Sequence, residues 1–300
     1  MSEIILHHYP MSPFGQAMRM ALTIKQMAWK SVEQPVICPK PELSVLTGGY
    51  ERIPVLQIGA DIFCDTDCIT DALETAKAEP SLYPAPTGRA GKLLALWGGA
   101  SWFMPAVGTA LGSNADMMDE AFWQDREVRF GMKKEAFLPA VPHLQGQFAA
   151  GGQALENALS DGRAFIGGDS PGHADCTLYA CVAFAGLSGL QPSALGAHVA
   201  AWFDRLSAIG LGDDEDVWAT QQAIDHAKAC QPMGGCTVDE TMGFAAGQQV
   251  AIKTVSPDPA TVHGTLVGLT AQRVSLARET AEAGLVHVHF PLLGQLLTAA

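Results

Sequence analysis

The chain lacks a C-x-x-C pair, a long apolar run and a basic N-terminal segment. Its seven cysteines are odd in number and scattered, so they predict neither a zinc site nor a disulfide framework, and reduced thiols are expected. No apolar segment approaches the roughly 20 residues that span a bilayer. The opening M-S-E-I-I-L-H-H does not resemble a signal peptide. We therefore expect a cytoplasmic protein without a membrane partner.

Basic residues are also scarce. The chain has 18 Lys and Arg residues against 31 Asp and Glu residues, which gives a formal net charge of −13. A field of that sign repels phosphate backbones, so nucleic acid is not an expected partner. An anionic ligand would therefore need a local group of donors that acts against the overall charge.

The order of the sequence patterns predicts three domains in the 300 residues. Residues 1–80 read β-α-β, a proline-stiffened loop C-P-K-P-E-L and then β-β-α, which predicts a small mixed sheet with helices on its faces. After a proline-rich linker, residues 89–230 show only helical periodicity and predict an all-α domain. Residues 240–300 alternate with period two and predict a small antiparallel β-barrel-like domain.

Three short motifs mark the first domain. In Y-P-M-S-P-F-G-Q-A-M-R, Ser12 directly before Pro13 signals a helix start. In R-I-P-V-L, Pro54 stands where a central strand would open, and in C-D-T-D-C-I the pair Asp65 and Thr66 precedes the next helix. Each motif alone also has a purely structural reading, as a helix cap or as a strand that starts with proline.

Together these motifs resemble the glutathione S-transferase family, whose members have a thioredoxin-like N-terminal domain and an all-helical second domain. The resemblance covers residues 1 to about 230. The first motif resembles the family's strand-to-helix turn, the second the stretch with a cis-proline, and the third an acid-plus-hydroxyl pair that is most often Glu-Ser. Further on, G-G-D-S-P-G-H-A-D-C-T-L resembles a capping box, with Gly172 in place of the usual hydroxyl residue and Asp175 retained.

The resemblance implies a glutathione site in this thioredoxin-like domain. A cis Ile53–Pro54 bond would leave the backbone N–H and C=O of Ile53 free to pair with the cysteinyl amide of glutathione, as an added strand pairs with a sheet edge. Asp65 would meet the ammonium of the γ-glutamyl end, and the helix start at Thr66 would meet its carboxylate. The glycyl carboxylate has two candidate partners, Lys40 and Arg52.

The implied activity is that of a glutathione transferase, in which the glutathione thiolate attacks a small hydrophobic electrophile. Ser12 at the helix start is the favoured group to stabilise the thiolate, and Tyr9 is the alternative. The turn offers no cysteine, which favours conjugation over a mixed disulfide with the protein. No metal is implied, and a homodimer is implied because family members commonly form one. The electrophile would lie against the second domain, around Trp97, Trp102, Phe103 and Met104.

Two other functions stay open. One is a non-catalytic binding or scaffold protein that keeps the transferase fold and contacts a partner through its β-rich tail. The other is a glutathione-dependent reductase or peroxidase that uses the same site. In the tail, His287 and His289 fall on one face of a predicted strand, and His263 could lie across from them. Two imidazoles at this spacing are usually solvated, so a metal site is not expected there.

Overall fold

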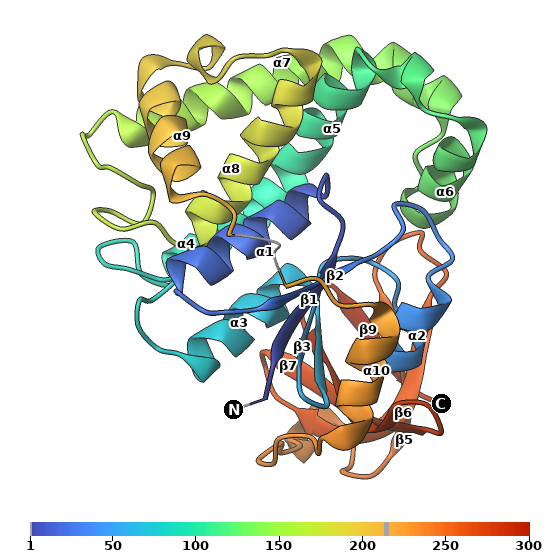
Figure 1. The fold of residues 1–300 in the computed structure, drawn as a ribbon. Coiled ribbons are helices and arrows are strands. Elements are labelled where there is room, and N and C mark those ends of the chain that lie inside the picture. The colour runs from blue at the N-terminus through green and yellow to red at the C-terminus, as the bar shows by residue number, and fades with distance from the viewer. Residues whose placement is uncertain (1, 213–215) are drawn as a thin grey trace.

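The structure, a computed structural model, describes residues 2–212 and 216–300. In these residues one nine-stranded sheet runs through the lower half of the molecule (Figure 1). Its strands are β1 (Ile4–His8), β2 (Lys30–Glu33), β3 (Val55–Ile58), β4 (Asp61–Cys64), β5 (Gln249–Thr254), β6 (Thr261–Leu269), β7 (Arg273–Thr280), β8 (Gly284–Pro291) and β9 (Gln295–Ala299). They lie in the order β2-β1-β3-β4-β8-β7-β6-β5-β9.

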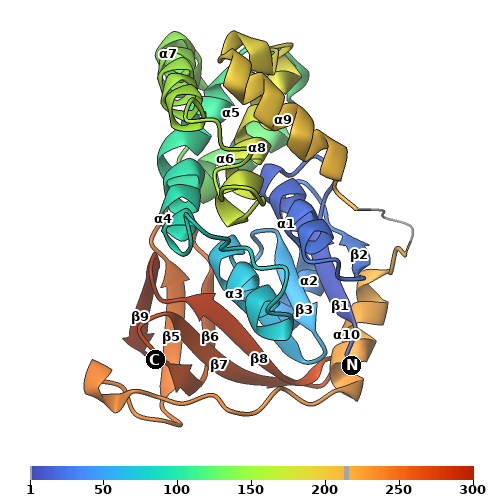
Figure 2. The same ribbon diagram turned by 90° about the vertical axis from the view of Figure 1, so that its left-hand side faces the viewer.

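The helices form a layer above the sheet and also cover its two faces (Figures 1 and 2). They are α1 (Pro13–Ile24), α2 (Pro41–Thr47), α3 (Thr66–Ala76), α4 (Ala90–Trp97), α5 (Phe103–Gly112), α6 (Glu120–Phe130), α7 (Lys134–Leu159), α8 (His173–Ala185), α9 (Ala197–Ile209) and α10 (Thr220–Ala229). A π-helical turn (Gly98–Trp102) joins α4 to α5. No helix in the described part of the chain is long and apolar enough to cross a membrane.

The N-terminal strands have the predicted thioredoxin-like arrangement. Strand β1 pairs with β2 in parallel and with β3 antiparallel, and β3 pairs antiparallel with β4. The predicted loop C-P-K-P-E-L is wrong in its second half, because Pro41 is the first residue of α2. Proline is tolerated at this position, where its fixed φ suits a helix and its missing N–H would have no partner.

The helical layer is held together around Asp175, near the start of α8. Its carboxylate accepts hydrogen bonds from the backbone N–H groups of Ile166 (2.7 Å), Gly167 (3.0 Å) and Gly172 (2.9 Å). The indole N–H of Trp202 donates a fourth, at 2.8 Å. The acidic half of the predicted capping box is therefore formed, and it also ties α9 to the loop before α8.

Helix α10 lies within the range predicted as all-α, but it packs on the sheet. It contacts α2, β2 and β8 on the face opposite α1 and α3. The side chain of Gln57 donates to the carbonyl of Ala223 in α10 at 2.9 Å and hydrogen-bonds to His7 at 3.1 Å. This face carries buried residues of β1, such as Ile5, that need a covering element.

The C-terminal strands do not form a separate barrel. They pair antiparallel with one another, as predicted, but the sheet is open. Strand β8 pairs in parallel with β4, with Phe63 opposite His289, so the five strands extend the N-terminal sheet (Figure 2). One core cluster consequently combines β3, β4, α2 and α10 with the C-terminal strands.

Candidate functional site

The two predicted thiolate-stabilising residues lie in one turn between β1 and α1. Ser12 is 3% exposed, its N–H donates to the Tyr9 carbonyl at 3.0 Å, and its Oγ accepts from the N–H of Gly15 at 3.1 Å. Because the Gly15 N–H uses only one lone pair of the Ser12 oxygen, the hydroxyl hydrogen of Ser12 can still be donated. Burial raises the pKa of the Tyr9 hydroxyl, and the nearby Arg126 guanidinium opposes that rise. Because the pKa of Tyr9 is raised, its hydroxyl stays protonated at neutral pH, so both side chains can donate a hydrogen bond.

Asp65 caps α3 from an unusual backbone conformation. Its φ is 76°, and its carboxylate accepts from the N–H of Asp67 at 3.0 Å. Burial raises the pKa of Asp65 above its usual value, and that hydrogen bond and the charge of Arg52 oppose this rise only in part. A non-glycine residue in this region costs about 1–3 kcal/mol and persists only where its surroundings hold it, often at functional sites. Thr66 follows as the first residue of α3.

The backbone before β3 is open for pairing. The Ile53–Pro54 peptide bond is cis, and Pro54 is buried. Within the described residues, neither the N–H nor the C=O of Ile53 is hydrogen-bonded to another group. An extended ligand could therefore use one donor and one acceptor here.

Lys40 lies inside the loop between β2 and α2. It is 4% exposed, and its backbone N–H donates to the Glu51 carboxylate at 2.8 Å. Its Nζ lies 3.3 Å from the Sγ of Cys38. Although burial acts in the other direction, hydrogen bonds from the Lys40 N–H and the Ser44 hydroxyl lower the pKa of Glu51. The Lys40 ammonium is therefore held close to the Cys38 thiol, while its backbone N–H is bound by the Glu51 carboxylate.

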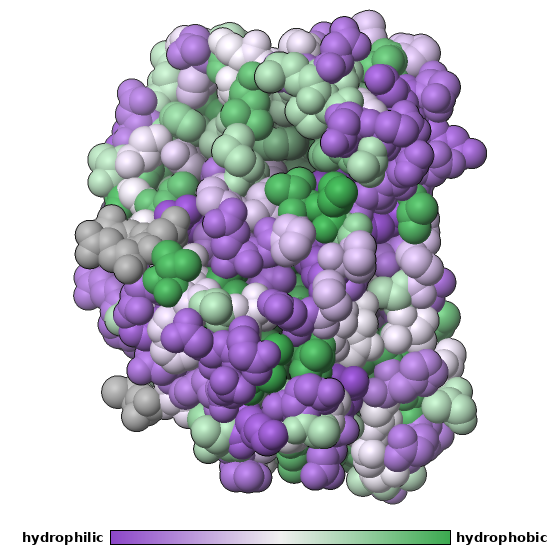
Figure 3. Space-filling view, turned by 45° about the vertical axis from the view of Figure 1, so that its right-hand side comes forward, coloured by the Kyte–Doolittle hydropathy of each residue, from purple (hydrophilic) through white to green (hydrophobic). Residues whose placement is uncertain are grey.

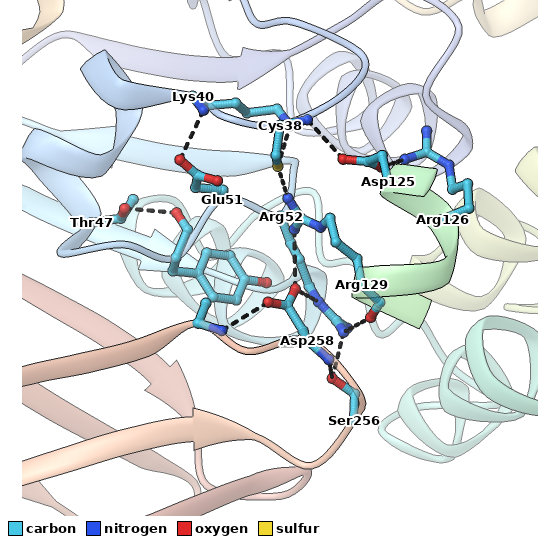
Figure 4. Close-up of polar contacts among 12 residues, drawn as sticks. Cys38, Lys40, Thr47, Glu51, Arg52, Asp125, Arg126, Arg129, Ser256 and Asp258 are labelled. Carbon is cyan, nitrogen blue, oxygen red and sulfur yellow. Dashed lines mark hydrogen bonds and ion pairs between the residues drawn. The ribbon is translucent and has the colours of Figure 1, made fainter. Parts of the chain in front are cut away.

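Arg52 is paired with the C-terminal domain rather than left open (Figure 4). Its Nε donates to Oδ2 of Asp258 at 3.0 Å, and its Nη2 donates to the Ser256 hydroxyl at 2.6 Å. Arg129 of α6 makes a second ion pair with the same Asp258 oxygen, at 3.2 Å. A ligand carboxylate at Arg52 would therefore share the guanidinium with Asp258.

Helix α6, in the helical layer, contributes further charged residues to this junction, which we define as Arg52, Arg129 and Asp258. The N–H of Cys38 donates to Asp125 at 2.8 Å, and Arg129 contacts the Cys38 sulfur (Figure 4). Arg126 pairs with Asp125 and donates to the Val36 carbonyl at 3.4 Å. None of these residues was predicted from the sequence, although the i, i+3 spacing of the arginines in R-E-V-R places both on one helix face.

The predicted wall for the electrophile is partly core. Trp102 is 2% exposed and stacks between Trp97 and Phe148, with ring centroids 5.5 and 4.8 Å away. Met104 is 39% exposed and faces outward. The ring of Phe103 packs against that of Phe14, with centroids 4.6 Å apart. Figure 3 shows a hollow in the upper half of the molecule that hydrophobic side chains border.

A cavity of about 410 Å³ lies away from all of these residues. It is lined by Glu3, Leu22, Thr23, Gln26, Met27, Ala28, Trp29, Lys30, Gly212 and Asp216. None of these residues belongs to the predicted glutathione site. This cavity is therefore not the candidate site, which rests on the placement of Asp65, the Ile53 backbone and the Ser12 turn.

The tail histidines do not form a three-histidine cluster. His287 and His289 both face Asp61, whereas His263 is exposed on β6. Among the described residues, no group of three or more His, Cys, Asp or Glu side chains could hold a metal ion.

Comparisons with known proteins agree with this fold. The family profile "Glutathione S-transferase, N-terminal domain" matches residues 6–81, and "Glutathione S-transferase, C-terminal domain" matches residues 138–205. A GST-like protein from Pseudomonas syringae is 34% identical, with complete coverage of both chains and a TM-score of 0.80. No curated protein matches the chain.

More distant solved structures share the fold. A glutathione S-transferase from Methylobacterium radiotolerans, in complex with glutathione sulfonate, is 18% identical, covers 79% of this chain and 100% of its own, and has a TM-score of 0.55. A Tau class glutathione S-transferase from mango is 20% identical, covers 76% of this chain and 98% of its own, and has a TM-score of 0.53. The Pseudomonas protein, by contrast, also spans the C-terminal strands.

Proposed function

Because the chain belongs to the glutathione S-transferase family, we propose that it binds glutathione beside Ile53, Asp65 and the Ser12 turn and transfers it to a small hydrophobic electrophile. The observation that carries this proposal is Asp65. A carboxylate is held at the start of α3 by a backbone conformation that costs free energy, next to the unpaired backbone of Ile53.

The γ-glutamyl end of glutathione carries an ammonium and a carboxylate. Within the described residues only Oδ1 of Asp65 is hydrogen-bonded, to the N–H of Asp67, which leaves Oδ2 for the ammonium. The N–H of Thr66 has no partner among the described residues and lies at the positive end of α3, where it would meet the carboxylate. The two charges of this end are thus matched by groups one residue apart.

The thiolate would form beside the start of α1. We assign its stabilisation to the Ser12 hydroxyl, which the helix dipole assists, with the Tyr9 hydroxyl as the alternative donor. Nucleophilic attack would then join the sulfur to an electrophilic carbon and release the leaving group. Among the predicted partners of the glycyl carboxylate, Arg52 would share its guanidinium with Asp258, and Lys40 would need to turn from Cys38.

A glutathione-dependent reductase is a second candidate, and Cys38 is the observation that favours it. Burial raises the pKa of the Cys38 thiol, but Arg129 and Lys40 oppose that rise. In this reaction the Cys38 thiolate would attack a glutathionyl disulfide and release the substrate thiol. A second glutathione would then reduce the mixed disulfide and leave as oxidised glutathione. Cys38→Ser would abolish reduction and spare conjugation.

Calorimetric titration with glutathione tests the site. We choose Asp65→Gly because glycine adopts the 76° φ without strain, so that the carboxylate is removed and the fold is kept. Loss of a charged hydrogen bond, about 1.5–3 kcal/mol, weakens binding about 10- to 100-fold. The charge control is Asp204→Asn, on the exposed face of α9; asparagine is used there because glycine would disturb the helix.

The binding titration tests the glutathione site, and a separate conjugation assay tests the activity. Absence of glutathione binding to the wild-type chain would sink the transferase proposal. Equal binding by Asp65→Gly would move the site elsewhere. Conjugation to chlorodinitrobenzene by Ser12→Ala and Tyr9→Phe then identifies the thiolate donor, since only loss of the true donor lowers the turnover while glutathione affinity is kept.

A further inference from the structure

A buried polar chain crosses the sheet where the C-terminal strands join β4. The Nε2 atom of His289 lies 2.9 Å from Oδ1 of Asp61, and its Nδ1 lies 2.8 Å from the Oγ of Ser275. All three residues are at most 2% exposed. Strand register places His289 between Phe63 and Ser275, and its ring stacks on Phe63 with centroids 4.6 Å apart. The histidine is thus fixed in orientation on both sides.

The hydrogen bonds assign the protons in this chain. Oδ2 of Asp61 accepts from the N–H of Met233 at 2.6 Å, so the carboxylate acts as an acceptor on both oxygens. Nε2 of His289 therefore carries the hydrogen. Burial lowers the pKa of His289, which leaves the ring neutral and Nδ1 a bare acceptor. The Ser275 hydroxyl consequently donates to a base that a carboxylate orients, with the two ring nitrogens in exchanged positions relative to the serine protease triad.

Ser275 also lines a second cavity, of about 60 Å³. Ser275 and Gly268 form its buried floor, and the exposed residues Gly235, Thr237 and Thr270 lie at its rim. A bound water needs about 10–15 Å³ of cavity volume, so a cavity several times that size has room for a small acyl group. A Cβ on Gly268 would come within 3.0 Å of the Ser275 hydroxyl. Glycine thus leaves the space beside the buried Ser275 hydroxyl open.

Arg273 supplies a positive charge at the same cavity. It is partly buried, and within the described residues its guanidinium makes no hydrogen bond or ion pair. It is close enough to His289 to act on it electrostatically. An unpaired guanidinium beside an activated hydroxyl is the kind of group that stabilises an oxyanion.

We propose that Ser275 is the nucleophile of a second, glutathione-independent site that hydrolyses short-chain acyl esters. The Ser275 oxygen attacks the ester carbonyl while its proton passes to Nδ1 of His289, and Arg273 faces the oxyanion. The bond to the alcohol oxygen breaks, and the imidazolium returns the proton to that oxygen. Water then attacks the acyl-serine and gives one proton to Nδ1. The acyl–oxygen bond breaks, and the proton returns to Ser275, which leaves a carboxylic acid and an alcohol.

Covalent labelling of the full chain tests the nucleophile without any substitution. The wild-type protein is treated with diisopropyl fluorophosphate in the absence of glutathione, and its peptides are mapped by mass spectrometry. A diisopropylphosphoryl group on Ser275 supports the proposal. A chain without an adduct at Ser275 overturns it and leaves the polar chain as a structural link between β4, β8 and β7.

Hydrolysis of p-nitrophenyl acetate tests the activity. Ser275→Ala should slow hydrolysis about 100-fold, the usual contribution of such a base–nucleophile pair. The matched control is Ser31→Ala, which removes another buried serine of the sheet that is bonded to a histidine, His8, at 2.9 Å but lies outside the cavity. Equal rates for Ser275→Ala and wild type refute the site. So does hydrolysis that Cys236→Ser alone abolishes, since Cys236 lines the same cavity.

Discussion

Replacing Asp258 with asparagine removes the charge at the junction of the three chain regions. The Asp258 carboxylate is 5% exposed and accepts from Arg52 at 3.0 Å and pairs with Arg129 at 3.2 Å. Asparagine keeps the size and one acceptor oxygen but leaves two guanidinium groups close together without a counter-charge. We therefore expect a large loss of stability from a single-atom change.

The magnitude follows from burial. Breaking a buried ion pair by removing one partner costs about 3–5 kcal/mol, and the partial exposure of Arg52 places Asp258→Asn near the lower end. Burial of Asp258 acts against ionisation, but hydrogen bonds from the Ala260 N–H and Arg52, with the charge of Arg129, still lower its pKa. A lowered carboxyl pKa contributes stability above the unfolded value near 4 that is lost as the pH falls through the folded value.

Urea unfolding at neutral pH and at pH 3 measures both effects. The free energy of unfolding should fall by about 3 kcal/mol at pH 7, and the difference between variant and wild type should shrink at pH 3. Asp204→Asn, an exposed position on α9, should change stability by less than about 0.5 kcal/mol. A loss for Asp258→Asn as small as that of Asp204→Asn would show that the junction does not hold the regions together.

Three further predictions concern the described core. His7 and His173 stay neutral because burial lowers their pKa values to about 4 and about 3. The unfolded chain takes up these protons first, so each histidine lowers stability by about 1.4 kcal/mol per pH unit below 6.5, and flat urea midpoints from pH 7 to 5 would contradict this. Asp175→Ala should cost more than 4 kcal/mol, read by thermal unfolding, because four buried donors lose their acceptor. Gly151→Ala should cost about 1–3 kcal/mol, because its Cβ would meet Trp102 at 2.1 Å, and unchanged near-UV circular dichroism would refute that overlap.

Local signals in the sequence were reliable where the structure they determine is also local. Ser12 before Pro13 marks the start of α1, and Asp65 before Thr66 marks the start of α3, because a cap is made by residues within one turn. The order of the elements in the first 80 residues, apart from α2, followed from turn and period patterns, and their thioredoxin-like arrangement from the family resemblance. The role of these residues in binding glutathione stays a prediction that the proposed titration tests.

Long-range pairing could not be read in this way. Arg52 and Asp258 are 206 residues apart, and nothing in S-P-D-P indicates which arginine that loop will meet. A period-two pattern is the same whether strands close into a barrel or extend the edge of another sheet. The sequence therefore did not reveal that β8 pairs with β4. For the same reason His287 and His289 were weighed against His263 and not against Asp61, which lies in another domain by sequence.

Because β4 pairs with β8, the edge of the N-terminal sheet stays unpaired until β8 has been synthesised. Asp61 and His289 are 228 residues apart, so at about 5–20 residues per second a ribosome needs roughly 10 to 45 s to deliver the partner of β4. Throughout that interval the nascent thioredoxin-like sheet presents an unpaired edge, the kind of surface that recruits other chains. Slow translation or a truncated message would prolong the exposure. Yield in the cell should thus depend on how quickly the last sixty residues arrive as well as on the stability of the finished fold.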